Sequence, residues 1–399
     1  MPAPRLAVFA VFLFNGALFL SWAARMPALA AQVGATEATL GLALFGASVG
    51  LASTAPFAAK LCARVGARKL ILVGAAVTVV AVPSLTLAET PFQLGLVLFV
   101  LGSCGASLDV GMNVAAVAVT RSLDRPLMPQ FHAGFSVGGL VGSLGAAAAA
   151  AVGWGLTRHL IFVAVIGAVV IVWVIRSVPD TTADAGGETS DAVEEDRPVL
   201  KRPLLWLLAT ITLFSAIAEG AASDWSALFF VNERGVGEAA AAAAYAGFSI
   251  AMATARLFGE PAQRRVGPYR LLAVGAVVAA AGLALAVLVV SPAVGYAGFA
   301  LVGLGLAFAF PVIMDLAGDA GKRADGTGGE REIGLVTTVA YTGFLLGPPV
   351  VGGIAHASNL SISLGFVACV IALMVPAVLL ARRSRARELT RAGAGSTRP

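Results

Sequence analysis

An acid and an amide lie four residues apart in the middle of an apolar stretch that is long enough to cross a bilayer. Asp109 and Asn113 belong to the run from about residue 92 to 119, and residues four apart share one face of a helix. An ionised carboxylate at this depth is costly unless it faces protein or water. The pattern favours a polar cavity in which Asp109 binds and releases protons and Asn113 contacts a substrate. The alternative is an acid that is hydrogen-bonded between packed helices.

A second acid, Glu219, lies in the apolar run 204–231. Its face of the expected helix carries four hydroxyl side chains, those of Thr212, Ser215, Ser223 and Ser226. Such a polar stripe is typical of a helix that lines a water-filled cavity. Glu219 is therefore a second candidate for proton coupling, and Ser215 and Ser223 are candidates for substrate binding. A structural acid held by these hydroxyls is an equal alternative.

The first apolar run contains further polar candidates. Asn15 is expected near the middle of the membrane, where its amide could orient hydroxyl or carbonyl groups of a substrate, and Trp22 is a second substrate-binding candidate. Bonding of Asn15 to another helix is an equal alternative. Arg25 follows near the outer end of the run, where a long cationic side chain usually reaches toward the interface. The alternatives for Arg25 are recognition of an anion or pairing with Asp224, and Arg25 is a candidate for gating.

Small residues, prolines and one histidine predict where helices approach closely or move. Gly102 and Gly105, close to Asp109, should allow a neighbouring helix to approach. Gly347 and Pro348 predict bending in a gate or static close packing. His132 begins an apolar run, where it could pass protons as part of a gate, although an exposed or loop-bonded histidine is the commoner case.

The composition excludes a soluble protein. Hydrophobic residues make up 58% of the 399-residue chain, charged residues make up 12%, and the mean hydropathy is +0.89. We therefore expect an all-α polytopic membrane protein. The twelve expected spans are residues 6–29, 38–59, 69–88, 92–119, 131–153, 158–177, 204–231, 239–258, 270–290, 293–316, 333–355 and 360–381.

Several function classes lack their sequence signatures. The three cysteines are too widely spaced for a metal motif or a disulfide framework, and no Walker sequence or nucleophile–base constellation is present. The net charge of +5 does not belong to a soluble basic domain, so nucleic-acid binding is not expected. We expect neither an enzyme nor a cofactor or metal, and a transporter of this kind must draw its energy from a gradient.

The distribution of charge predicts the domain organisation and the topology. Residues 179–203 hold seven acids together with Gly, Ser and Thr, which is typical of a flexible linker. The expected parts are an N-terminal six-helix bundle (1–178), this linker on the cytoplasmic side, a C-terminal six-helix bundle (204–382) and a basic cytoplasmic tail (383–399). All but three of the 27 Lys and Arg residues then lie on one side, which places both termini in the cytoplasm.

The two halves contain similar segments. Residues 65–75 (VGARKLILVGA) match residues 266–276 (VGPYRLLAVGA), and the Gly-Phe pair at 134 recurs at 343. Six spans separate the two members of each pair, so both halves have the same orientation. This is a parallel repeat.

Twelve spans, a 6+6 parallel repeat, a central loop and basic loops after the second and eighth spans resemble the major facilitator superfamily. The family's loop pattern is Gly-x-x-x-Asp-Arg-x-Gly-Arg-Arg. The first copy here keeps Arg64 and Arg68 but has alanine at 59 and 63, and the second copy keeps Arg265. The resemblance implies that these three arginines contribute to gating.

A closer resemblance, to the YbjJ-like bacterial transporters, extends over nearly the whole chain. It is carried by residues 14–16 (FNG), 21–27 (SWAARMP), 108–113 (LDVGMN), 125–126 with 131–132 (RP, FH), 219–220 with 224–226 (EG, DWS), and 343–344 with 347–349 (GF, GPP). These transporters are neighbours of the fucose and hexose proton symporters. The resemblance implies a multi-pass protein of the bacterial cytoplasmic (inner) membrane and leaves the substrate open.

The sequence as a whole predicts a secondary transporter that moves a small-molecule substrate across the lipid bilayer by alternating access, with coupling to protons and as a monomer. An uncoupled facilitator or an exporter of drugs or metabolites is the first alternative. A membrane receptor without transport is the second.

Overall fold

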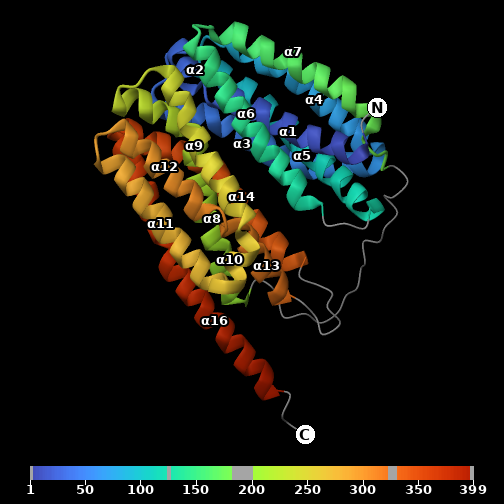
Figure 1. Cartoon of the computed structure of the whole chain (residues 1–399), viewed down its shortest axis with the longest axis vertical. Coiled ribbons are helices and arrows are strands. Elements are labelled where there is room, and N and C mark those ends of the chain that lie inside the picture. Colours follow the sequence, from blue (N-terminus) through green and yellow to red (C-terminus); the bar gives the residue numbers. More distant parts are fainter. Residues whose placement is uncertain (1–2, 124–126, 182–200, 322–329, 396–399) are drawn as a thin grey trace. The chain divides into compact units, whose positions relative to one another are not determined.

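The computed structural model describes residues 3–123, 127–181, 201–321 and 330–395, and every regular element within them is a helix (Figure 1). Up to residue 181 the elements are α1 (Pro4–Ala23), α2 (Met26–Gln32), α3 (Glu37–Val65), α4 (Ala67–Ser84), η1 (Leu85–Leu87), α5 (Pro91–Leu123), α6 (Met128–Ala151), α7 (Leu156–Val174) and η2 (Ile175–Ser177). The later helices are α8 (Pro203–Arg234), α9 (Glu238–Leu257), α10 (Gly259–Val266), α11 (Pro268–Leu288), α12 (Pro292–Leu306), α13 (Ala309–Gly321), α14 (Glu330–Ala357), α15 (Leu360–Ala372) and α16 (Met374–Gly395).

Within the described residues, eleven helical segments are long and apolar enough to cross a membrane. They coincide with eleven of the twelve predicted spans. The twelfth, 239–258, is helical as α9 but is not among the eleven. Its apolar residues are mostly alanine, whose small side chain contributes little to membrane transfer, and Arg256 lies in its last turn.

Three predicted spans are interrupted in the structure. The span 6–29 is divided at Ala24 and Arg25 into α1 and α2, because Pro27 at the start of α2 has no amide hydrogen to continue the first helix. The span 293–316 is divided between α12 and α13, and the span 360–381 between α15 and α16. The last helix continues to residue 395, so much of the predicted basic tail is helical.

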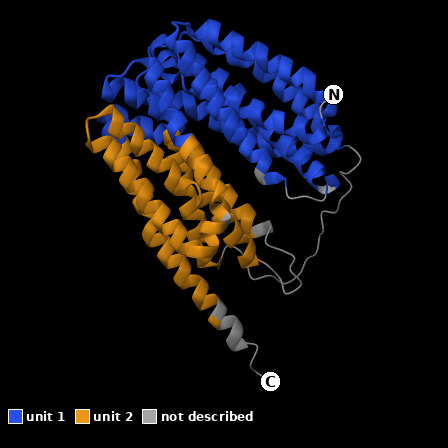
Figure 2. Ribbon diagram, in the orientation of Figure 1, with its two compact units in different colours: residues 1–190, 223–249, 348–363 blue, residues 191–222, 250–347, 364–399 orange. Residues whose placement is uncertain are grey.

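The chain forms two compact units (Figure 2). Unit 1 comprises residues 1–190, 223–249 and 348–363, and unit 2 comprises residues 191–222, 250–347 and 364–399. Boundaries between the units fall inside α8, α9, α14 and α15. The predicted division into six-helix halves stays a prediction, and residues 182–200 of the predicted linker lie outside the described residues.

Glycine lets paired helices of unit 1 approach closely. A Cβ atom on Gly138 of α6 would overlap the carbonyl oxygen of Leu13 on α1, and one on Gly102 of α5 would overlap that of Ala47 on α3. The close approach predicted at Gly102 is therefore present. The one predicted at Gly105 is wrong, because a Cβ atom there would meet nothing within 4 Å. In unit 2, Gly275 of α11 packs against Gly305 of α12 in the same manner as Gly138.

The internal repeat is visible in the backbone. Gly66 between α3 and α4 has φ and ψ of 86° and 156°, and Gly267 between α10 and α11 has 81° and 151°. A positive φ of this size is costly for residues with a side chain, so both copies need glycine at this point. The two copies of the sequence repeat thus form the same turn, one in each unit.

Candidate functional site

Asp109 lies on α5, and its side chain is exposed in the described structure. Its polar contacts come from its own helix. The side-chain amide of Asn113 donates to Oδ1 of Asp109 at 3.2 Å and to its main-chain carbonyl at 2.8 Å. No cation lies within ion-pair distance of this carboxylate among the described residues. The Asp109 carboxylate therefore accepts one hydrogen bond from a neutral amide and has no counter-charge among the described residues.

The face of α5 around Asp109 is open. Gly105, Asp109 and Asn113 follow one another at four-residue spacing and share that face. A methyl group added to Gly105 would have nothing within 4 Å, Asp109 is exposed, and Asn113 is half-buried. The opposite side of the same turns is packed, with Leu108 and Met112 buried. The expected packing of a neighbour over Gly105 is thus replaced by open space, which leaves the carboxylate accessible.

Asn15 of α1 lies next to this helix. Its side-chain amide donates to the sulfur of Met112 on α5 at 3.7 Å, and the residue is half-buried. A thioether is a weak acceptor, so this contact leaves most of the hydrogen-bonding capacity of the amide unused. Trp22, the other candidate on α1, is buried and packs edge-on against Phe19 with ring centroids 5.2 Å apart. In this structure its ring is part of the packing.

The polar stripe of α8 divides between the two units. In unit 2, Thr212 and Ser215 are buried, and the Thr212 hydroxyl donates to the carbonyl of Leu208. Glu219 is half-buried and has no ion-pair partner among the described residues. In unit 1, the Ser223 hydroxyl donates to the Asp224 carboxylate at 2.9 Å.

A second charged cluster in unit 1 surrounds Arg25, whose side chain is buried. Arg25, at the break between α1 and α2, donates through Nε to the Glu238 carboxylate at 2.5 Å and through Nη2 to the carbonyl of Trp154 at 3.1 Å. Its side chain is 3% exposed. Arg25 therefore does not reach toward the surface as the sequence suggested, and its acidic partner is Glu238 instead of Asp224. Burial of a guanidinium requires such a partner.

Sequence reasoning missed the residues around Arg25. Glu238 begins α9, where an acid in the first turn looks like ordinary helix-end chemistry. The Arg158 guanidinium lies 4.3 Å from the centre of the Trp154 ring. His159 is buried, and neither ring nitrogen has a hydrogen-bond partner among the residues that the structure describes. No spacing rule connects residue 25 with residue 238, so only the fold brings them together.

The arginines proposed for gating have different environments. Arg68, at the start of α4, donates to the carbonyl of Val178 at 2.7 Å and lies 4.0 Å from the Asp180 carboxylate. Arg64 on α3 and Arg265 on α10 are exposed. Arg68 thus connects α4 to the chain that follows η2.

The other gating candidates lie in unit 1 or at its boundary. His132 is exposed on α6, and its ring lies edge-on to Phe12 at 5.3 Å between centroids. Pro348 lies inside the continuous helix α14, and its carbonyl would be 2.6 Å from a Cβ atom on Gly41. A Cβ atom on Gly347, in unit 2, would have nothing within 4 Å. Close packing is therefore observed at Pro348.

No group of three or more metal-binding side chains occurs within the described residues, and the three cysteines are free. The chemistry available at the sites described above is that of carboxylates, amides and the Arg25–Glu238 ion pair. These groups can bind a polar solute and hold or release a proton, depending on the exposure and the ion pairing of each group.

Comparison of the sequence with known proteins identifies the family to which the chain belongs. Residues 7–329 match the family model described as Major Facilitator Superfamily. An uncharacterized MFS-type transporter of Yersinia pestis is 31% identical over 383 residues, which are 95% of this chain and 94% of the relative. The membrane protein MosC of Rhizobium meliloti is 26% identical over 397 residues, 97% of this chain and 93% of that protein.

Solved structures share the fold at low sequence identity. A mutant of the nucleoside transporter NupG superposes with a TM-score of 0.76 at 12% identity, covering 94% of this chain and 99% of that one. A bacterial homolog of the human lysosomal transporter Spinster, in an inward-facing and occupied conformation, gives a TM-score of 0.75 at 15% identity, covering 96% and 98%.

Proposed function

Because this chain belongs to the Major Facilitator Superfamily and is an MFS-type transporter, we propose that it is a secondary active transporter, coupled to protons and working by alternating access. Its cargo is a small polar solute. The finer placement beside the YbjJ-like transporters is part of the proposal, as are two six-helix halves (1–178 and 204–382) that rock against each other and a monomeric state.

The open carboxylate of Asp109 is the observation that carries proton coupling. It lies in the interior of α5, a helix of spanning length, and it is exposed, with no cation of the described residues within ion-pair distance. An acid inside a membrane protein is expected to face the interior or a water-filled path. Because no salt bridge holds Asp109 ionised, it can take up a proton in one access state and release it in the other.

The neighbouring amides supply candidates for solute binding. Asn15 and Asn113 can each donate and accept hydrogen bonds, and Asn113 already contacts Asp109. A solute bound to Asn113 would therefore compete with its hydrogen bond to the carboxylate. This gives a direct route by which solute binding and protonation of Asp109 influence each other.

The Arg25–Glu238 pair is the proposed outer gate. It joins two segments that are more than 200 residues apart in the chain, and the carbonyl of Trp154 adds a third. Opening would require the buried Arg25 guanidinium to separate from the Glu238 carboxylate, and such a pair has two distinct states, formed and broken. An uncoupled facilitator or an exporter, in which the acids only bind solute, is the alternative function.

Transport assays distinguish these functions. The purified protein in proteoliposomes should accumulate at least one solute from a broad panel of metabolites when a pH gradient is imposed. A facilitator would equilibrate the same solute without accumulating it. Failure to move any solute in either direction, with the protein shown to be folded, would contradict transport itself.

The orientation in the cytoplasmic membrane is also part of the proposal, with both termini inside. It predicts that a cysteine at Asn232, which is exposed, reacts with an impermeant thiol reagent in intact cells, and that a cysteine at the exposed Lys60 does not. The three native cysteines are first replaced by serine. Labelling at position 60 and protection at position 232 would reverse the topology.

A further inference from the structure

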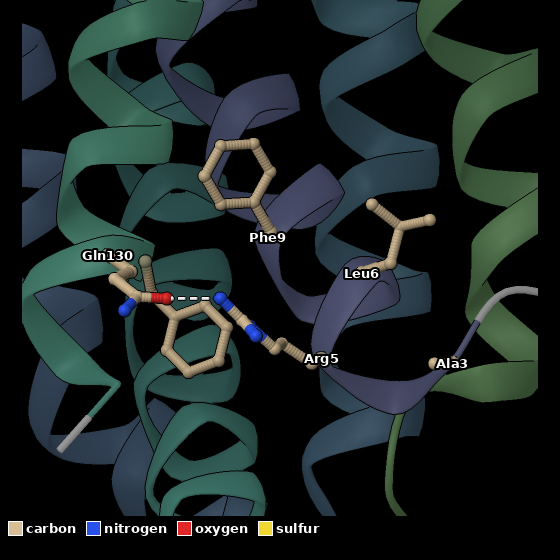
Figure 3. A pocket seen from close by; sticks show the side chains of 6 residues that line it. Ala3, Arg5, Leu6, Phe9 and Gln130 are labelled. Atoms are coloured by element: carbon tan, nitrogen blue, oxygen red, sulfur yellow. Dashed lines mark hydrogen bonds between the residues drawn. The ribbon is translucent and has the colours of Figure 1, made fainter. Parts of the chain in front are cut away.

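A half-open cavity of about 360 Å³ lies between the first turn of α1 and the first turn of α6, in unit 1 (Figure 3). Arg5 and Gln130 provide its polar groups. Its remaining lining is apolar and consists of Ala3, Leu6, Phe9 and Phe131. The cavity is separate from Asp109 and from the Arg25 cluster, so nothing in the transport proposal accounts for it.

Arg5 places a cation at this cavity. Figure 3 shows its guanidinium reaching from α1 to Gln130 on α6, where Nη2 donates to Oε1 at 2.6 Å. Arg5 is exposed, and no carboxylate lies within ion-pair distance of it among the described residues. The neutral Gln130 amide accepts a hydrogen bond from only one of the five N–H groups of Arg5. The charge of Arg5 and most of its donors are therefore available to a ligand.

The two helix starts reinforce this positive charge. The hydrogen bond between Arg5 and Gln130 shows that α1 and α6 begin side by side. Neither helix has a side-chain cap, and neither has an acid in its first turn. Each N-terminus carries a partial positive charge, although a proline at the start of each helix reduces the number of free amide groups. Two uncapped N-termini and an arginine thus surround one opening.

The apolar lining makes the cavity unsuited to a fully polar ion. Leu6 is 50% exposed, and Phe131 closes the inner wall with 1% exposure. Because α1 spans the membrane and Arg5 lies in its first turn, the cation is at the depth of lipid headgroups and the apolar surface is at the depth of acyl chains. Basic pockets of this kind between spanning helices suit lipids with anionic headgroups.

We propose that this cavity binds one anionic phospholipid, with the phosphate on Arg5 and an acyl chain against Leu6 and Phe9. The lipid bridges α1 and α6 at the end where both helices begin. Its phosphate also meets the partial positive charge of the two helix starts. Binding stabilises the contact between these two helices.

The test measures lipid binding to the full-length protein in a nonionic detergent, by native mass spectrometry and by the melting temperature. Phosphatidylglycerol should bind and raise the melting temperature, whereas phosphatidylcholine and soluble glycerol phosphate should have little effect. Arg5→Gln keeps a polar side chain and removes the charge, and it should weaken phosphatidylglycerol binding about fivefold, as expected for one cation near a membrane surface.

Two further variants make the result specific. Arg5→Lys keeps the charge and should retain most of the binding. Arg176→Gln removes another exposed arginine, which does not line the cavity, and should bind phosphatidylglycerol as the unmodified protein does. Unchanged binding by a folded Arg5→Gln variant would overturn the proposal. Equal effects of phosphatidylcholine, or of glycerol phosphate alone, would overturn it as well, because the site would then not select an anionic lipid.

Discussion

Unit 1 contains two charged side chains in opposite environments: the Asp109 carboxylate is exposed, and the Arg25 guanidinium is buried in an ion pair. Asp109 is exposed and is contacted only by a residue of its own helix. Arg25 is 3% exposed and is held by Glu238 and by the carbonyl of Trp154, which belong to distant segments. The Asp109 carboxylate can be protonated without disturbing the packing. The Arg25 guanidinium cannot lose Glu238 without a loss of stability. The exposed carboxylate therefore suits proton binding, and the buried ion-paired arginine suits a gate.

The largest expected effect separates function from stability at Asp109. Asp109→Asn keeps the shape and cannot ionise, so it should abolish gradient-driven accumulation. Solute exchange without a gradient should persist, because exchange requires no net proton movement. The free energy of unfolding should change by less than about 0.5 kcal/mol, as for other exposed substitutions. The measurements are transport in proteoliposomes and thermal unfolding. Normal accumulation by the variant would make Asp109 a structural residue.

Substitution of Glu219 tests whether a second unpaired carboxylate contributes to transport beside Asp109. It lies in unit 2 on α8 and, like Asp109, has no ion pair among the described residues, although Glu219 is half-buried and Asp109 is exposed. Glu219→Gln should lower accumulation without abolishing it. If Glu219 binds the solute, exchange falls in parallel, and if it carries the proton, only accumulation falls. Unaltered transport by both measures would exclude it from the mechanism.

Substitution of Glu238 tests how much its ion pair with Arg25 contributes to stability. Glu238→Gln leaves the buried Arg25 guanidinium without a counter-charge. Breaking a fully buried pair costs about 3–5 kcal/mol, and because Glu238 is 34% exposed we expect roughly 1–2 kcal/mol less stability, measured by thermal unfolding.

Glu89→Gln is the control for that substitution, since Glu89 is exposed and in no ion pair among the described residues. The double replacement Arg25→Met with Glu238→Leu should recover most of the lost stability, because no buried charge then remains unpaired. If Glu238→Gln and Glu89→Gln were equally stable, the two charged sites would not differ in the way described above.

The smallest effect is expected at Asn113. Asn113→Ala removes the hydrogen bonds to the main-chain carbonyl and to the carboxylate of Asp109, and it should lower accumulation about twofold, since water can replace the amide at this exposed carboxylate. Ser107→Ala is the matched control, because the Ser107 hydroxyl donates to the carbonyl of Ser103 on the same helix. A complete loss with Asn113→Ala would mean that the Asn113 amide is essential to transport and not one of several groups that bind the solute.

Much of the fold could be predicted because hydropathy is a local property. A span needs about 20 apolar residues, and each of the twelve predicted segments is helical in the structure. The repeated segments at 65–75 and 266–276 predicted equivalent turns, and Gly66 and Gly267 have nearly the same backbone angles. The helix breaks at Arg25 and between α12 and α13 could not be predicted from hydropathy, because apolar residues continue through both.

The sequence by itself determined the class of protein, the positions of the spans and the presence of an acid within α5, since these depend on composition and on spacing along one helix. Only the tertiary structure decided which side of α5 is open and which acid neutralises Arg25. Gly105 was expected under a neighbouring helix and lies in open space, and Glu238 is the partner of Arg25 although more than 200 residues separate them. The reason is physical. A helical period shows which residues share a face but not what packs on that face, and an ion pair between distant segments leaves no local pattern in the chain.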